Sequence, residues 1–300
     1  MMKILNFGSL NLDYVYRVPH FVRGGETLAS RSMEVFPGGK GLNQSVAFSR
    51  AGAEVYHAGS VGCEGGMLLE VLREAGVDTR FVRTLSDTPT GHAIIQVSDE
   101  GDNCILLCGG ANLCRDGAFT EEALSHFSEG DLLMLQNEIN APVEVAALAK
   151  ARGMLVALNP SPFNEAITEE LLALTDYLIL NETEGREITG REDEEEILRK
   201  LHARFPAMRI ILTLGGRGSL YSDGTETIRQ DIFKVTPVDT TAAGDTFTGY
   251  FFSTLLGGDE KNPAKALRTA SAASAIAVSR MGAAPSIPTM DEVEKFLMNK

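Results

Sequence analysis

Residues 238–251, VDTTAAGDTFTGYF, place an aspartate inside a run of small residues, directly before an apolar pattern. From Phe247 onward, large apolar side chains recur at the spacing of one helix face. The predicted helix therefore begins near Ala243 to Asp245, where backbone N–H groups have no partner within the helix. Small side chains leave these N–H groups open to an anion, and the helix dipole favours negative charge there. Taken alone, Asp245 can be an ordinary first-turn residue or the centre of a catalytic site.

Outward from this stretch, short continuous apolar runs alternate with helical segments along most of the chain. The pattern is typical of a parallel sheet covered by helices on both faces. The predicted strands are 3–8, 54–62, 131–136, 154–159, 176–181 and 209–215. The predicted helices among them are 41–51, 65–75, 142–152, 183–189 and 193–204. We expect a single domain over 1–300, because no repeat or linker interrupts the alternation.

Two segments depart from this alternation. Residues 12–36 and 90–107 have the character of β-ribbons, with polar turns at RGGE and DEGDN. They can be peripheral hairpins, or they can form a small sheet over a ligand crevice. The ribbons alone do not distinguish these interpretations.

The overall composition excludes several classes of function. The net charge is −14, from 41 acidic and 27 basic side chains, which argues against a nucleic-acid-binding surface. No apolar run approaches the ~20 residues that cross a bilayer, and the N-terminus has no signal-peptide pattern. The spacing of the four cysteines matches neither a zinc site nor a disulfide framework. We therefore predict a cytoplasmic protein with reduced thiols and no nucleic-acid or membrane partner.

Polar residues and glycines follow the predicted strands. In open parallel sheets, ligands bind beyond the carboxyl ends of the strands, so these residues predict a polar site with room for a hydroxylated ligand and phosphates. They are Gly8, Ser9, Asn11, Asp13, Gln136, Glu138, Asn159, Asn181, Glu184, Thr213, Gly215 and Gly216.

The glycine-rich stretch PGGKGLNQ, 37–44, fits neither the Walker loop nor the dinucleotide-binding fingerprint. It leaves a backbone that a ligand can approach closely, with Lys40 and Asn43 available for hydrogen bonds. A purely structural turn explains the glycines equally well.

The stretch at 238–251 nevertheless resembles the signature of the ribokinase-like (PfkB) carbohydrate kinases, and seven others match that family in order. They are GSLNLD (8–13), PGGKGLNQ (37–44), LQNEI (135–139), NPSP (159–162), LNETEGREITG (180–190), LTLGGRGSL (212–220) and AVSRMGAAPSIP (277–288). The resemblance spans residue 3 to about 290 and is strongest to the ribose-phosphorylating members. It implies a three-layer α/β/α sandwich with a mainly parallel, Rossmann-like sheet. It also implies a small β-sheet lid built from the insertions at about 12–36 and 90–107, which often forms a homodimer contact.

The resemblance also implies residue roles. Asp245 corresponds to the general base, and the backbone of Ala242, Ala243, Gly244 and Asp245 to an anion hole. The residues that match sugar contacts are Asn11, Asp13, Gly39, Lys40, Asn43, Glu138 and Asp245. Those that match ATP contacts are Asn181, Thr213, Gly215, Gly216, Gly218, Gly244 and Ser271. Glu184 corresponds to the residue that holds Mg²⁺ through water. The residues that match a site for K⁺ or a similar monovalent cation are Asp239, Thr241, Ala277, Arg280, Gly282 and Ser286.

The implied function is ATP-dependent phosphorylation of a primary hydroxyl of a small sugar, D-ribose to ribose 5-phosphate. Another sugar, a sugar phosphate or a nucleoside is the alternative, because Arg17, Arg23 and Arg31 in the lid region leave a phosphorylated substrate open. A non-catalytic nucleotide- or sugar-binding protein is a remote alternative, since Asp245, Asn181 and Glu184 are all present. The sequence departs from the family at Cys63 and Glu64, where an Asp is usual, and at Ser271, where a larger polar residue can lie near adenine.

Overall fold

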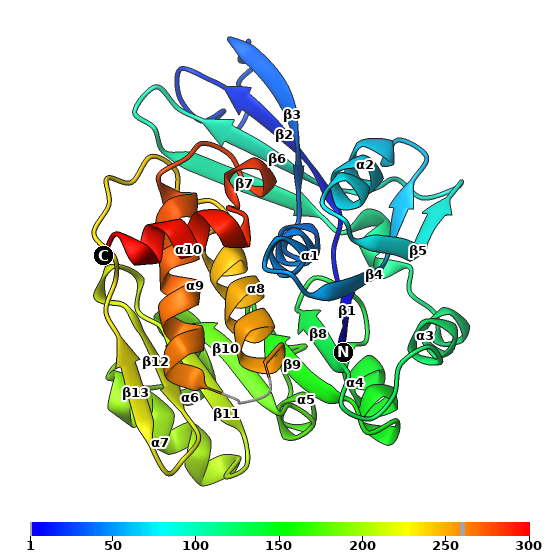
Figure 1. The fold of residues 1–300 in the computed structure, drawn as a ribbon. Coiled ribbons are helices and arrows are strands. Elements are labelled where there is room, and N and C mark those ends of the chain that lie inside the picture. The colour runs from blue at the N-terminus through cyan, green and yellow to red at the C-terminus, as the bar shows by residue number, and fades with distance from the viewer. Residues whose placement is uncertain (1, 259–261) are drawn as a thin grey trace.

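The computed structural model describes residues 2–258 and 262–300 and shows an α/β fold built on one large sheet (Figure 1). The nine strands lie in the order β13-β12-β11-β10-β9-β8-β1-β4-β5, and all neighbours from β11 to β5 run parallel. The strands are β1 (Lys3–Phe7), β4 (Glu54–Gly62), β5 (Asp78–Leu85), β8 (Leu132–Gln136), β9 (Leu155–Asn159), β10 (Tyr177–Asn181), β11 (Arg209–Thr213), β12 (Ser219–Ser222) and β13 (Thr227–Gln230). β12 and β13 form an antiparallel extension at one edge. The predicted mainly parallel sheet is confirmed.

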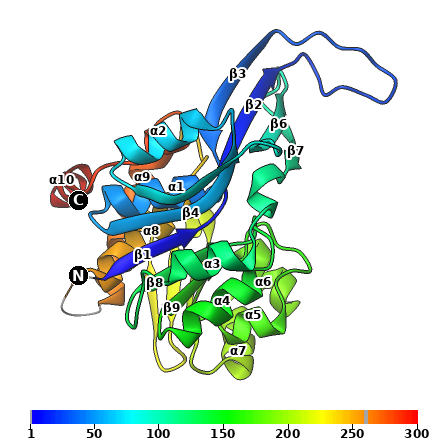
Figure 2. The same ribbon diagram turned by 90° about the vertical axis from the view of Figure 1, so that its right-hand side faces the viewer.

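Helices cover both faces of this sheet, which makes the three-layer sandwich that the sequence predicts (Figure 2). One face packs against α1 (Lys40–Arg50), α2 (Gly66–Glu74), α8 (Ala243–Leu256), α9 (Pro263–Val278) and α10 (Met290–Met298). The other packs against α3 (Gly117–Leu124), α4 (Pro142–Ala151), α5 (Glu169–Ala173), α6 (Glu182–Thr189) and α7 (Glu194–Arg204). Strands such as β8, buried at every residue, are continuously apolar because both of their faces contact helices.

The predicted strands and helices are all present, with bounds that differ by at most two residues. Several elements were not predicted: β5, β12, β13, α3, α5, α9 and α10. The strands among them are short or only partly buried, so their apolar pattern is weak. α9 is rich in alanine, which gives little contrast between its two faces.

The two predicted β-ribbons combine into a separate four-stranded sheet, which we call the lid sheet. It comprises β3 (Ser32–Gly38), β2 (Asn11–Arg17), β6 (Gly91–Val97) and β7 (Asn103–Cys108), in that order. β2 pairs parallel with β6, and this pairing joins the two ribbons. The lid sheet projects from the end of the body to which β1 points, so it stands beside the carboxyl ends of the strands (Figure 2).

Close packing of α8 against α1 positions the stretch at 238–251. An ideal Cβ on Gly249 of α8 would lie 2.3 Å from Ala47 Cβ of α1, so only glycine allows this approach. The contact brings the first turns of the two helices together beneath the lid sheet.

No helix in the described parts of the chain is long and apolar enough to cross a membrane.

Candidate active site

Asp245 lies in the first turn of α8 and is almost fully buried. The residue before the helix, Ala242, has φ 59 and is left-handed, a conformation that small residues adopt at lower cost than branched ones. The Ala243 N–H donates to the Thr240 carbonyl at 3.2 Å, so it is not free. Within the described residues, the N–H groups of Ala242, Gly244 and Asp245 have no acceptor. Three of the four predicted anion-hole donors are thus open.

Two amide side chains from α1 hold the Asp245 carboxylate. Asn43 Nδ2 donates to Asp245 Oδ2 at 3.1 Å, and Gln44 Nε2 donates to Asp245 Oδ1 at 2.9 Å. The Asn43 Oδ1 atom is buried and has no partner among the described residues. The glycine-rich stretch therefore delivers two consecutive amides to the predicted base.

The lid sheet contributes Asn11 and Asp13 from β2. Asn11 is oriented by Asn112, whose Nδ2 donates to Asn11 Oδ1 at 2.8 Å. Burial, aided by the nearby Glu138 carboxylate, raises the pKa of Asp13 to about 6. An ideal Cβ on Gly38 would lie 2.0 Å from Asp13 Oδ2, which explains one glycine of the PGGKG stretch. Gly39, with φ 96, explains the next.

Lys40 provides the positive charge of the site. Burial opposes its charge, but the carboxylates of Asp245, Glu138 and Glu184 outweigh that effect and raise the pKa of Lys40. Burial raises the pKa of Glu138, an effect that Lys40 and the Ser9 hydroxyl partly offset. The Lys40 N–H also donates to Glu138 Oε2 at 3.2 Å. Lys40 thus links the predicted sugar-binding residues to the predicted phosphate-binding residues.

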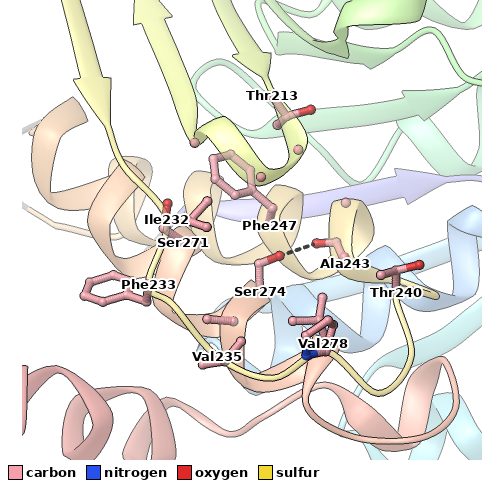
Figure 3. Close-up of a pocket in the computed structure, with 16 residues that line it drawn as sticks. Thr213, Ile232, Phe233, Val235, Thr240, Ala243, Phe247, Ser271, Ser274 and Val278 are labelled. Atoms are coloured by element: carbon pink, nitrogen blue, oxygen red, sulfur yellow. Dashed lines mark hydrogen bonds between the residues drawn. The ribbon is translucent and has the colours of Figure 1, made fainter.

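A pocket of about 410 Å³ lies on the other side of the α8 N-terminus, between the turn after β11 and α9 (Figure 3). All the predicted ATP-binding residues except Asn181 line it: Thr213, Gly215, Gly216, Gly218, Gly244 and Ser271. Its apolar wall, which the sequence did not predict, comes from Ile232, Phe233, Val235, Phe247 and Val278. The Ser274 hydroxyl donates to the Ala243 carbonyl at 3.2 Å and so fixes the start of α8 against α9. The pocket suits a flat apolar base with its phosphates directed toward α8.

A smaller pocket of about 230 Å³ joins this one, since Thr213, Thr240, Ala243 and Gly244 line both. Lys40, Asn181, Glu184 and Asp245 also line it. Asn181 and Glu184 form a reciprocal capping box at the start of α6, which rigidly places both side chains. A single carboxylate beside an amide suits Mg²⁺, which keeps most of its water and binds oxygen ligands. The arrangement fits a metal held through water by Glu184.

The residues predicted for a monovalent cation belong to two adjacent loops. Asp239 joins them: its carboxylate accepts the Thr241 N–H and the Gly282 N–H, each at 2.9 Å. Partial burial opposes ionisation of Asp239, but these hydrogen bonds prevail and lower its pKa. The Arg280 guanidinium pairs with Glu292 at 2.6 Å, so only its carbonyl is available to a cation. Ala277 and Ser286, which are fully or almost fully buried, belong to the second loop and its flanks.

Comparison with known proteins agrees with this geometry. The family model described as pfkB family carbohydrate kinase matches residues 1–290. The chain belongs to the pfkB family of carbohydrate kinases. It is 37% identical to a ribokinase of Haemophilus influenzae over 298 residues, covering 97% of this chain and 96% of that one. It is 35% identical to a ribokinase of Bacillus subtilis, covering 99% of this chain and all of the other.

Among solved structures, ribokinase of Arabidopsis thaliana complexed with ribose and ATP matches with a TM-score of 0.89 and 31% identity, covering 99% of both chains. As a carbohydrate kinase, the pfkB-family chain is a phosphotransferase that acts on an alcohol group, with ATP and a divalent metal such as Mg²⁺. The kinase activity, fold and family expected from the sequence are confirmed.

The departure at Glu64 has a structural explanation: its Oε1 accepts the Thr90 N–H at 2.7 Å, just before β6 of the lid sheet.

Two polar residues of the site were missed by sequence reasoning. Gln44 directly contacts Asp245, and Asn112 orients Asn11, yet neither follows a predicted strand. The signal for Gln44 was its adjacency to Asn43 at the start of a helix. The signal for Asn112 was weak, because it lies in the short helical turn Gly110–Leu113 after the lid sheet.

Proposed function

We propose that this carbohydrate kinase phosphorylates D-ribose at its primary hydroxyl, with ATP as donor and ribose 5-phosphate as product. The observation that carries the proposal is the position of Asp245. Asp245 accepts a hydrogen bond from Asn43 and lines the smaller pocket together with Lys40. That pocket joins the larger one that suits a nucleotide. Relatives named ribokinase cover nearly the whole chain, and one solved structure holds ribose and ATP.

In this mechanism, Asp245 accepts the proton of the primary hydroxyl as that oxygen attacks the γ-phosphate. The open N–H groups of Ala242, Gly244 and Asp245 receive the charge that develops on the transferred phosphoryl group. Lys40, which lines the same pocket, supplies a further positive charge. A bound divalent cation neutralises phosphate charge. Asp13 orients the sugar by accepting hydrogen bonds from its other hydroxyls, and Asn11, whose Oδ1 accepts from Asn112, donates to the sugar through its Nδ2.

The position of the lid arginines favours an uncharged sugar over a sugar phosphate. Arg17 lies four residues beyond Asp13 on extended β2, which is ~13 Å at the usual rise per residue. Arg31 is paired with Asp99 and half-exposed, and its N–H donates to the Arg17 carbonyl. Arg23 lies in the loop between β2 and β3, which projects away from the body (Figure 2). A pentose held by Asp13 thus lies ~13 Å along the strand from the backbone of Arg17, and Arg31 is already engaged by Asp99, which favours an uncharged sugar.

The lid sheet supports a homodimer. β7 is an edge strand, and its consecutive Ile105, Leu106 and Leu107 are 59%, 68% and 48% exposed. An apolar edge strand is a site of association unless it is covered, because its backbone N–H and C=O groups are unpaired. A second copy of the chain would cover it, and we place the dimer contact there.

The paired loops around Asp239 support activation by K⁺ or a similar monovalent cation. The loop with Asp239 and Thr241 lies directly before the start of α8, and Gly282 joins the second loop to it, so a cation bound by their carbonyls would fix the open N–H groups of the anion hole. Replacing K⁺ by tetramethylammonium, which is too large for such a site, should lower the rate. An unchanged rate would contradict this part of the proposal.

A coupled assay of ADP release tests the function. It uses Mg²⁺-ATP with pentoses, hexoses, their phosphates and nucleosides, each with and without K⁺. We expect the highest kcat/KM with D-ribose. A higher kcat/KM with a sugar phosphate or a nucleoside would identify that compound, and not ribose, as the substrate. If no acceptor led to ADP release, the result would favour a binding protein.

A further inference from the structure

We infer that Gln44 is a positioning residue for the reaction, and that a buried chain of amide side chains sets the direction in which it donates. This inference rests on the proposed role of Asp245 as the base. Gln44 is fully buried and makes three hydrogen bonds. Its Nε2 donates to Asp245 Oδ1 at 2.9 Å and to Asn159 Oδ1 at 3.2 Å. Its Oε1 accepts from Gln136 Nε2 at 2.7 Å.

An amide side chain can be turned by 180° with little change in shape, so something must select the orientation that offers N–H to Asp245. Asn6 begins that selection. Its Nδ2 faces the Gly41 carbonyl at 2.8 Å, and a carbonyl can only accept. Asn6 Oδ1 must therefore face Gln136, which presents its Nε2 at 2.9 Å. Because the same Nε2 also contacts Gln44, Gln44 presents Oε1 to it and Nε2 to Asp245.

A second backbone carbonyl fixes the same orientation independently. Asn159 Nδ2 donates to the Ile179 carbonyl at 3.0 Å, so Asn159 turns its Oδ1 toward Gln44. Only the Nε2 end of Gln44 satisfies that acceptor. Asn159 on β9 and Asn6 on β1 therefore require the same orientation of the Gln44 amide, with Nε2 toward the Asp245 carboxylate.

The glycines of the GSLNLD and PGGKGLNQ stretches make room for this chain. An ideal Cβ on Gly8 would lie 2.2 Å from Gln136 Oε1 and 2.7 Å from Gly41 Cα. One on Gly41 would lie 2.4 Å from the Ser9 backbone nitrogen. Larger residues at either position would displace the amides or the backbone between them.

Directional donation to Asp245 has a chemical consequence. A base that accepts a proton from the sugar hydroxyl must be an ionised carboxylate with a lone pair aimed at that hydroxyl. Asn43 and Gln44 each occupy one lone pair on a different oxygen, which fixes the plane of the carboxylate and leaves lone pairs free. Gln44 has no contact with the nucleotide pocket, so its effect should fall on the chemical step rather than on binding.

The test compares Gln44→Met and Gln44→Glu with the wild-type enzyme and with Asp245→Asn. Gln44→Met keeps the length of the side chain and removes the donor, and Gln44→Glu keeps the shape and places an acceptor against Asp245. We expect kcat to fall ~10–100-fold, as for loss of a residue that orients a reacting group, with the Kd values for sugar and ATP by calorimetry unchanged. Gln44→Glu should be at least as impaired as Gln44→Met.

Thr175→Val is the matched control. Thr175 is buried, its hydroxyl donates to the Leu171 carbonyl at 2.9 Å, and it lies before β10 at the opposite end of the strand from Asn181. The Thr175→Val variant should lose stability because it too loses a buried hydrogen bond, and it should keep the wild-type kcat. If Asp245→Asn is inactive but either Gln44 variant keeps more than half of the wild-type kcat, the role of Gln44 is wrong and the base assignment stands. If Asp245→Asn stays active, the base assignment itself fails. A loss in the Gln44 variants that appears equally in kcat and in both Kd values would reduce Gln44 to a structural residue.

Discussion

The two sheets of this kinase place polar groups by different means. In the nine-stranded sheet, Asn6, Gln136 and Asn159 lie among strands covered on both faces, and their amides are held by backbone carbonyls and by one another. In the lid sheet, Asp13 has no hydrogen-bond partner among the described residues, although it is largely buried. The body thus fixes the orientation of the carboxylate proposed for chemistry, whereas Asp13 of the lid sheet offers an unpartnered carboxylate to a substrate. Loss of function on the body side should therefore appear in kcat, and on the lid side in sugar binding.

The largest expected effect is on the body side. Asp245→Asn keeps the size of the residue and removes the base, so kcat should fall ~10²–10⁴-fold while the fold is kept. Steady-state ADP release and a thermal melt measure the two quantities. A variant that retains more than about a tenth of the wild-type kcat is not compatible with a general base at this position.

The lid counterpart is Asp13→Asn. Loss of one charged hydrogen-bond acceptor should lower kcat/KM for the sugar by ~10–100-fold, mostly through KM, with KM for ATP unchanged. In the wild type, the pKa of Asp13 is raised to about 6, so the ionised acceptor is lost as pH falls through 6. The wild-type kcat/KM for the sugar should therefore decline below pH 6. An Asp13→Asn variant whose sugar KM equals that of the wild type would show that the lid does not bind the substrate.

The Asp13 carboxylate, when ionised, should also lower the free energy of unfolding. Its pKa is about 6 in the folded chain against 3.8 as a reference, so the folded state holds more protons between these values. Stability then falls as pH rises from about 4 to 6. Asp13→Asn should melt at a higher temperature than the wild type above pH 6, and this advantage should vanish below pH 4. Melts across that range measure it, and an advantage independent of pH would point to a cause other than ionisation.

A smaller effect is expected from the contact between α8 and α1. Gly249→Ala places a Cβ 2.3 Å from Ala47 Cβ, and overpacking of this kind costs ~1–3 kcal/mol. The helices should separate slightly, so Tm and kcat both fall, and the loss of kcat/KM for the sugar should be smaller than in the Asp13 variant. Gly66→Ala in α2 is the control, because nothing lies within 4 Å of its Cβ. Equal melting temperatures for the two variants would contradict the close approach.

The smallest effect on catalysis should come from the edge of the lid sheet. Leu106→Glu with Leu107→Glu places two charges on β7 and should convert a dimer to a monomer while each subunit keeps its catalytic groups. Light scattering during size-exclusion chromatography measures the mass. Thr227→Glu on β13, an edge strand of the nine-stranded sheet, should leave the mass unchanged. A wild-type monomer, or a double variant that stays dimeric, would show that the lid sheet does not form a dimer contact.

The sequence by itself determined the parallel sheet, because strands buried on both faces must be continuously apolar, and β8 and β10 show this directly. It also determined the family and the start of α8, since eight short stretches occur in order and Asp245 begins an amphipathic pattern. Edge elements such as β12 and β13 were not predicted, because their short, mixed patterns lack a clear period.

Only the tertiary structure decided which groups act together. Asp245 and Gln44 are 201 residues apart in sequence, and Gln136 reaches Gln44 across 92. No local pattern encodes such contacts, because they arise where separate strands end at one edge and where Gly249 lets two helices touch. The direction of the Gln44 amide depends on carbonyls of Gly41 and Ile179, which every residue possesses. Backbone groups carry no side-chain identity, so their role becomes visible only once the chain is folded.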